Sequence, residues 1–229
     1  MILATLLDLI FPRLCLGCKA SLREDRVLCS NCFERIPLHR TLFCAVCLAR
    51  LPEGKKICHN DAWYIFGAAT DYAPPVRELI HALKFKYVKK AHEPLATLLA
   101  SYIQSLPLPE LQDSIVIPIP LSRARERDRG FNQTHMIAQV IAHHLNIPLA
   151  PRVLTRTKNT TAQTNLRTTN ERRENMRAAF SLSGPDFIQG KTIILIDDVR
   201  TSGATLTEAA SVLKQAGAKK IFGFVVARA

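Results

Sequence analysis

The sequence predicts an α/β protein in which a parallel sheet carries helices on both faces and follows a small cysteine-rich module. From residue 65 on, apolar runs rich in β-branched residues alternate with segments whose apolar residues recur at helical spacing. Strand–helix–strand order with continuously apolar strands is typical of a parallel sheet that is covered on both faces. All seven cysteines lie between Cys15 and Cys58. We therefore expect a module of residues 1–62 and an α/β domain of residues 63–229.

The first segment, residues 1–11, is apolar and short, contains Asp8, and has no Lys or Arg ahead of its apolar stretch. Because no clear small-residue cleavage site follows, we interpret it as a short docked helix rather than a signal peptide. No apolar run of the chain reaches the roughly 18 residues of a membrane span. We expect a cytoplasmic protein that does not span a membrane, in a compartment where thiols stay reduced.

The cysteines come in close pairs, Cys15 with Cys18 and Cys29 with Cys32. Two residues between paired cysteines place both sulfurs on one tight turn, and two such turns supply four thiolates to a tetrahedral Zn²⁺. A module of about 50 residues buries little apolar surface, so a metal ion is an expected source of stability. The alternative is a set of free or redox-active thiols.

A second set of ligands begins with Cys44 and Cys47 and continues with Cys58. Its fourth cysteine is missing: Asp61 stands at the expected position, and His59 is also close. Both residue types ligate zinc. We expect a second, weaker zinc site, and the alternative is a loop that packs without metal. The predicted metal ligands are Cys15, Cys18, Cys29, Cys32, Cys44, Cys47, Cys58 and Asp61.

The α/β domain is predicted to consist of alternating strands and helices. The strands are short apolar runs, and the helices carry apolar residues at i, i+3 and i+4. Expected strands are residues 65–72, 114–117, 192–196 and 221–226, and expected helices are residues 76–83, 93–104, 133–145 and 205–216.

The strand over residues 192–196 ends in Asp197 and Asp198 and continues into a hydroxyl-rich turn, residues 201–205. Ligands of open α/β sheets bind at the carboxyl ends of strands. The turn offers backbone N–H groups, hydroxyls and a helix N-terminus, which suit a phosphate monoester. The two acids suit ribose hydroxyls or Mg²⁺. The pattern predicts a ribose 5-phosphate site; the alternative is an acidic strand end before a capped helix.

Residues 194–206 resemble the phosphoribosyl pyrophosphate (PRPP) motif of type I phosphoribosyltransferases. Residues 118–121, the arginines that follow them, and residues 129–133 resemble the pyrophosphate-loop region of ComF-type proteins. Residues 156–180 resemble their mobile-loop block, and the cysteine-rich leader resembles their double zinc ribbon. The departure is Asp61 in place of the usual eighth cysteine. The resemblance, to the ComF/GntX type, implies a type I phosphoribosyltransferase-like fold.

ComF proteins are tied to natural transformation, in which single-stranded DNA is handled as it enters the cytoplasm. On this resemblance, residues 201–205 would hold the 5-phosphate of PRPP, the two acids the ribose, and arginines with Mg²⁺ the pyrophosphate. The implied PRPP or nucleotide contacts are Asp197, Asp198, Thr201, Ser202, Gly203, Ala204, Thr205, Arg123 and Arg129, with Asp197 and Asp198 as catalytic candidates.

The chain is basic, with 31 Lys and Arg against 19 Asp and Glu, a formal net charge of +12. Residues 121–177 hold eleven of these cations and only four acids. One small ligand does not need so many cations, so the surplus suits a phosphodiester backbone. A solvated basic face is the alternative; Lys84 either faces the same groove or caps its helix. The predicted DNA contacts are Arg123, Arg125, Arg127, Arg129, Arg156 and Lys158.

Three functions are compatible with these features. The first is a protein that binds single-stranded DNA for transformation and carries a site for PRPP or a nucleotide. The second is an active phosphoribosyltransferase, whose acceptor no residue identifies. The third is an adaptor whose zinc ribbon docks a DNA-uptake helicase or channel protein.

Overall fold

The computed structural model describes residues 13–22, 24–51, 58–59, 61–158 and 168–229. The helix expected over residues 1–11 lies outside the described residues. Residues 159–167, in the block that resembles a mobile loop, also lie outside them.

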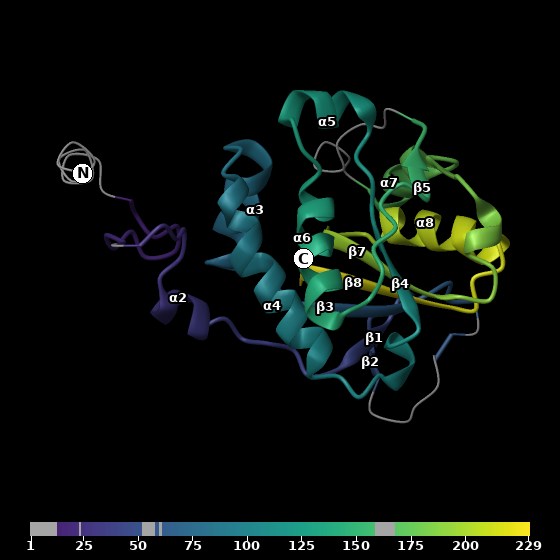
Figure 1. Ribbon diagram of the computed structural model, residues 1–229, viewed down its shortest axis with the longest axis horizontal. Coiled ribbons are helices and arrows are strands. Elements are labelled where there is room, and N and C mark those ends of the chain that lie inside the picture. The colour runs from purple at the N-terminus through teal and green to yellow at the C-terminus, as the bar shows by residue number, and fades with distance from the viewer. Residues whose placement is uncertain (1–12, 23, 52–57, 60, 159–167) are drawn as a thin grey trace.

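A six-stranded sheet forms the centre of the molecule, in the order β2-β1-β3-β8-β7-β4 (Figure 1). The last four strands of this order are parallel to one another, whereas β1 pairs antiparallel with β2 and with β3. A separate antiparallel pair, β5 and β6, lies beside it. The strands are β1 Leu42–Cys44, β2 Arg50–Leu51, β3 Ile65–Asp71, β4 Ser114–Pro118, β5 Leu154–Arg156, β6 Phe180–Leu182, β7 Thr192–Arg200 and β8 Lys220–Arg228.

Helices cover both faces of the sheet, with α3, α4 and α6 on one face and α8 on the other (Figure 1). None of the helices in the described ranges is both long and apolar enough to cross a membrane. The α-helices are α2 Ser30–Glu34, α3 Val76–Phe85, α4 His92–Gln104, α5 Arg123–Arg129, α6 Gln133–Leu145, α7 Thr169–Met176 and α8 Ala204–Gln215. Single 3₁₀ turns are Lys89–Ala91, Pro109–Leu111 and Pro185–Phe187.

The two-sided cover explains the apolar strands. In β7, Ile194 and Ile196 pack into the core beneath α3, α4 and α6, whereas Ile193 and Leu195 pack into the core beneath α8. Successive side chains of a strand point to opposite faces, so a strand that is buried on both faces has no polar alternation. The predicted α/β fold is confirmed, and β7 extends past the predicted end at residue 196 to Arg200.

Helix α5 was not predicted, because its sequence consists almost entirely of charged residues and has no apolar face. Its ends are well defined. The Ser122 side chain accepts a hydrogen bond from the Arg125 backbone N–H, and Gly130 ends the helix with a φ of 76°. Serine at the N-cap and a left-handed glycine after the last turn are common helix boundaries.

The cysteine-rich module joins the α/β domain through the sheet. In the antiparallel pairing of β1 with β3, Phe43 lies opposite Phe66 and Cys44 lies opposite Ile65. The first part of the module also contributes Cys15 to the core that contains α3 and α4. The domain boundary near residue 62 stays a prediction, and the sheet is continuous across it.

Candidate functional site

A cavity of about 320 Å³ opens at the carboxyl ends of β4 and β7. Parallel strands meet with their carboxyl ends at one edge, and this edge is where α/β sheets bind ligands. Residues from the strand end, the turn after it and helix α5 therefore converge, although they are distant in sequence. The predicted site residues that line this cavity are Asp197, Asp198, Thr201, Thr205, Arg125, Arg129 and Arg156.

The buried carboxylate of Asp198 is the best-anchored group of the cavity. Lys84 Nζ lies 2.7 Å from Asp198 Oδ1, and Gln133 Nε2 donates to Asp198 Oδ2 at 2.9 Å. Gln133 in turn accepts a hydrogen bond from Arg129 through its side-chain oxygen. Of the two sequence alternatives for Lys84, the structure therefore shows the one that faces the cavity. Gln133 was not among the predicted site residues, and its place in the first turn of α6, four residues after Arg129, was the available signal.

Asp197 lies next to this anchored carboxylate, and its own Oδ1 accepts a hydrogen bond from the Asp198 backbone N–H at 2.8 Å. Burial, together with the negative charge of Asp198, raises the pKa of Asp197 to about 7. A carboxyl group with such a pKa exchanges its proton near neutral pH. A ribose hydroxyl or a cation that reaches Asp197 would favour its ionised form.

Three arginines, Arg125, Arg129 and Arg156, line the same cavity as these acids. Burial, together with the positive charge of Arg125, lowers the pKa of Arg156 to about 10. Burial also lowers the pKa of Arg125 and of Arg129. Cations that are desolvated and close to one another are stabilised by an anionic ligand. The arrangement suits a polyphosphate group.

The turn over residues 201–205 divides its side chains between two sides. Thr201 and Thr205 line the cavity with the acids, whereas Ser202 and Ala204 line a different cavity, of about 380 Å³, behind the turn. The Ser202 hydroxyl accepts a hydrogen bond from the Ala204 backbone N–H at 3.4 Å. Gly203 has a φ of 80°, a left-handed conformation that favours glycine. Of the predicted phosphate contacts, Thr201 and Thr205 thus line the cavity of the two acids.

Helix α5 also divides its arginines. Arg125 and Arg129 are one turn apart and line the cavity of the two acids, whereas Arg123 lines a neighbouring groove of about 1220 Å³. Arg127 is exposed. Arg123, predicted at the pyrophosphate with Arg129, does not line the same cavity. Residues on one face of a helix are three or four apart, whereas Arg123 is two residues from Arg125 and six from Arg129.

The groove has its own basic and apolar lining. Arg152, which the sequence analysis counted in the basic segment only, lines the groove with Arg123, and Arg156 lies between the groove and the cavity of the acids, lining both. Lys158, a predicted DNA contact, is exposed and donates a hydrogen bond to the Arg177 carbonyl at 2.7 Å.

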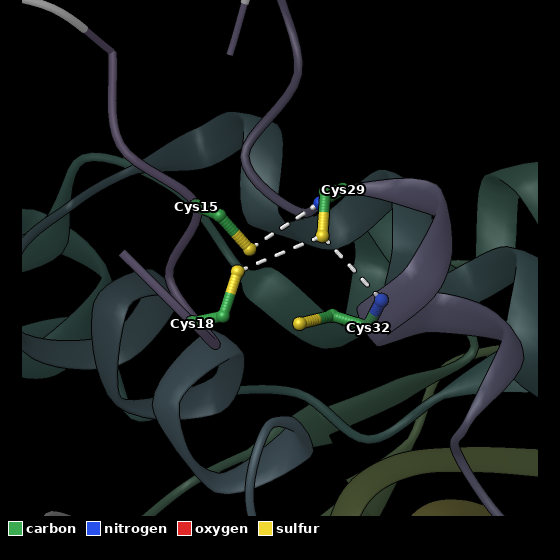
Figure 2. A group of neighbouring side chains, drawn as sticks. All are labelled: Cys15, Cys18, Cys29 and Cys32. Atoms are coloured by element: carbon green, nitrogen blue, oxygen red, sulfur yellow. Dashed lines mark hydrogen bonds between the residues drawn. The ribbon is translucent and has the colours of Figure 1, made fainter. Parts of the chain in front are cut away.

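The four cysteines of the first predicted metal site converge. Cys15 and Cys18 come from a loop, Cys29 and Cys32 from the start of α2, and Figure 2 shows their sulfurs pointing toward one another. All four sulfurs lie within 4.8 Å of one another, and Cys18 Sγ is 3.8 Å from Cys29 Sγ. Zn–S bonds of about 2.3 Å in a tetrahedron put sulfurs about 3.8 Å apart. The four residues fit a zinc ion.

The backbone near the first site also favours a thiolate. Burial raises the pKa of Cys15, but hydrogen bonds from the backbone N–H groups of Cys18 and Cys29 outweigh it and bring that pKa to about 6. The Cys29 N–H lies 3.3 Å from Cys15 Sγ (Figure 2). Zinc binds the thiolate form, so these donors support metal binding.

The second cluster consists of Cys44, Cys47, Cys58 and His59, whose ligand atoms lie within 4.8 Å of one another. His59 Nδ1 is 3.4 Å from Cys44 Sγ and 3.2 Å from Cys58 Sγ. Asp61, predicted as the fourth ligand, is exposed and lines the cavity behind the turn instead. The correction has a simple reason: an imidazole directly after Cys58 reaches the cluster. Three thiolates and one imidazole are a common structural zinc set.

Comparison with known proteins agrees with this architecture. A double zinc ribbon domain model matches residues 6–60, and a phosphoribosyl transferase domain model matches residues 134–228. The DNA utilization protein YhgH of Escherichia coli O157:H7 is 33% identical over 215 residues, which cover 91% of this chain and 87% of that protein. Competence protein F of Haemophilus influenzae (strain ATCC 51907 / DSM 11121 / KW20 / Rd) is 30% identical over 228 residues, covering 94% of this chain and 96% of that protein.

A third relative, competence protein ComFC of Bacillus subtilis (strain 168), is 26% identical over 226 residues, covering 94% of this chain and 84% of that protein. These matches confirm the resemblance that the motifs predicted: the chain belongs to the ComF family. Its fold combines a double zinc ribbon with a phosphoribosyltransferase domain, and the ribbon and the cysteine clusters support structural zinc.

Proposed function

We propose that this protein takes part in DNA uptake during natural transformation by holding single-stranded DNA in the basic groove beside a pocket for PRPP or a nucleotide. The observation that carries the proposal is the division of helix α5, which presents Arg123 to the groove and Arg125 with Arg129 to the cavity of the two acids. The name of the relative competence protein F supports the same role.

The groove suits a phosphodiester backbone. Arg123, Arg152 and Arg156 give it positive charge, and a single strand that binds such a groove through phosphates shows strong salt dependence. Phe131 lines the groove, but Lys89 Nζ lies 5.3 Å from the centroid of its ring. We therefore assign the affinity to phosphates rather than to base stacking, which makes the binding independent of sequence.

The cavity of the acids suits the three parts of PRPP. Thr201 and Thr205, at the start of α8, would hold the 5-phosphate. Asp197 would accept from the ribose hydroxyls, and Arg125 with Arg129 would hold the pyrophosphate. Mg²⁺ bound with PRPP would supply further positive charge. Because Asp198 already contacts Lys84 and Gln133, its main role in this proposal is to position these two side chains.

A second candidate function, phosphoribosyl transfer, is favoured because the two threonines, the two acids and the arginines line one cavity. An acceptor nucleophile would attack the anomeric carbon of ribose while the bond from that carbon to the pyrophosphate oxygen breaks. Pyrophosphate leaves with the bond's electron pair, and the acceptor loses its proton to solvent. Catalysis would rest on positioning and on stabilisation of the leaving group by the arginines. Pyrophosphate release across a panel of purine and pyrimidine acceptors tests this function, and its absence would contradict it.

A titration of a labelled single-stranded oligonucleotide tests the main proposal. It is carried out at two salt concentrations, with and without saturating Mg-PRPP. We expect tight binding at low salt that weakens steeply at high salt, since each released counterion contributes to the slope. We also expect Mg-PRPP to weaken DNA binding, because Arg156 lines both cavities. An oligonucleotide that does not bind at low salt would contradict the DNA role.

A further inference from the structure

Arg200 occupies an unusual position between the turn over residues 201–205 and the second metal cluster. It is the last residue of β7, directly before that turn, and its side chain is buried with 6% exposure. A cation this deeply buried is rare unless its donors are engaged or it serves a specific contact. Three contacts, with Gly203, with the Ala45 carbonyl and with the Phe66 ring, account for its position.

On one side, the guanidinium of Arg200 lies under the turn. A Cβ atom at Gly203 would be 2.7 Å from Arg200 Nη2 and 2.8 Å from Arg200 Nε. Any side chain at position 203 would therefore have to displace the arginine. The glycine, with its φ of 80°, and the arginine fit together, and the arginine supports the turn from behind.

On the other side, Arg200 Nη2 donates a hydrogen bond to the Ala45 carbonyl at 3.0 Å. Ala45 lies between Cys44 and Cys47, two ligands of the second metal cluster. The guanidinium carbon also lies 4.9 Å from the centroid of the Phe66 ring, in the strand that pairs with β1. The arginine thus bridges the phosphate turn and the metal-binding turn.

The geometry of the metal-binding turn depends on its ligands. Backbone hydrogen bonds from Cys44 N to the Ala49 carbonyl and from Leu48 N to the Cys44 carbonyl, each 2.9 Å, close the turn. Cys44 and Cys47 would both ligate a metal ion held by the second cluster, and the ion would further constrain the peptide groups between them, including the Ala45 carbonyl. Loss of the ion would remove this constraint and leave the two backbone hydrogen bonds to hold the turn.

We propose that Arg200 is a positioning residue through which metal occupancy of the second cluster sets the shape of the phosphate turn and hence its affinity for phosphate. This inference rests on the proposed function, in which the turn holds the 5-phosphate of PRPP. The first cluster has no such connection among the described contacts of Arg200. The metal would therefore control ligand binding from the cluster that contains His59.

The experiment uses the full-length, zinc-loaded protein with Arg200→Gln and His59→Ala, singly and together. Arg228→Gln is the matched control for the first change, because Arg228 ends the neighbouring strand and lies over the Phe43 ring, but contacts Asp71 instead of the ribbon's metal turn. Asp61→Ala is the control for the second change. The readouts are zinc per chain, the dissociation constant for Mg-PRPP, and amide hydrogen exchange over residues 201–205.

We expect both single variants to speed exchange in the turn and to weaken Mg-PRPP binding about tenfold, the effect of one charged hydrogen bond. His59→Ala loses one zinc, and Arg200→Gln keeps both. The combined variant should be no weaker than either single one, because both changes break one connection. The two control variants should keep the turn's exchange rate.

Additive effects, or unchanged exchange in His59→Ala protein that has lost its zinc, would overturn the inference. If the unaltered protein binds no Mg-PRPP, the proposed ligand is wrong, whereas the exchange readout still decides whether the metal shapes the turn. If Arg200→Gln does not fold, the comparison of His59→Ala with Asp61→Ala decides it.

Discussion

Lys84 Nζ lies 2.7 Å from Asp198 Oδ1, although 114 residues separate the two in sequence. The lysine comes from the last turn of α3 and the aspartate from β7. The aspartate side chain is only 4% exposed and the lysine side chain 22%, so this ion pair is largely shielded from solvent. The contact holds helix α3 against the candidate site and neutralises one of its two acids.

Replacement of Lys84 tests how much this ion pair stabilises the fold. Lys84→Met leaves the buried Asp198 carboxylate with the hydrogen bond from Gln133, and removal of one partner from a buried ion pair costs about 3 kcal/mol of unfolding free energy. Denaturant unfolding measures the loss. Lys86→Met, two residues further on and exposed, is the matched control and should stay within about 0.5 kcal/mol of the unaltered protein. Equal stability of the two variants would contradict the account.

The raised pKa of Asp197 predicts a pH dependence of stability. Because its pKa of about 7 lies above the ordinary 3.8, the folded state binds the proton more tightly than the unfolded state. The free energy of unfolding should therefore fall as pH rises from about 4 to about 7 and then level off. Asp197→Asn removes this dependence.

The measurement compares the two proteins by denaturant unfolding at several pH values. The advantage of Asp197→Asn over the unaltered protein should grow by up to about 4 kcal/mol across that window. A difference between the two proteins that stays constant from pH 4 to pH 8 would show that burial does not hold a proton on this carboxyl group.

Metal analysis tests the ligand set of the second cluster. We expect two zinc ions per chain in the unaltered protein, about one in His59→Ala, and two in Asp61→Ala, since the histidine and not the aspartate lies with the three sulfurs. The opposite result for the two variants would restore Asp61 as the ligand. We expect the cysteine-rich module to become less stable when the ion is lost, because metal binding is coupled to folding in small zinc-binding domains.

The fold was largely predictable because the signals are local. Each of the four parallel strands contains a short apolar run, and helix α6 has the bounds predicted from its apolar spacing, Gln133–Leu145. The short strands β5 and β6 have no such run and were not predicted. Three pairs of cysteines with two residues between them likewise identified six members of the two clusters, and Cys58 is the seventh. The acids and threonines of the cavity followed from their place after a buried strand.

The remaining site residues depend on contacts that sequence spacing does not encode. The arginines of α5 were predicted as one patch, because a charged segment without an apolar face gives no helical period to divide them. Lys84 reaches Asp198 only through the packing of α3 against the sheet. The sequence places Cys58, His59 and Asp61 close together as candidate ligands. Their spacing does not determine whether His59 or Asp61 reaches the other sulfurs.

The central claim, that α5 serves two ligands, is tested most directly by two charge-matched double variants. Arg123→Glu with Arg127→Glu should weaken single-stranded DNA binding more than tenfold, flatten its salt dependence, and leave the Mg-PRPP dissociation constant within about twofold. Arg125→Glu with Arg129→Glu should have its larger effect on Mg-PRPP. If both double variants weaken both ligands to the same extent, α5 does not divide its arginines between two sites, and the account is contradicted.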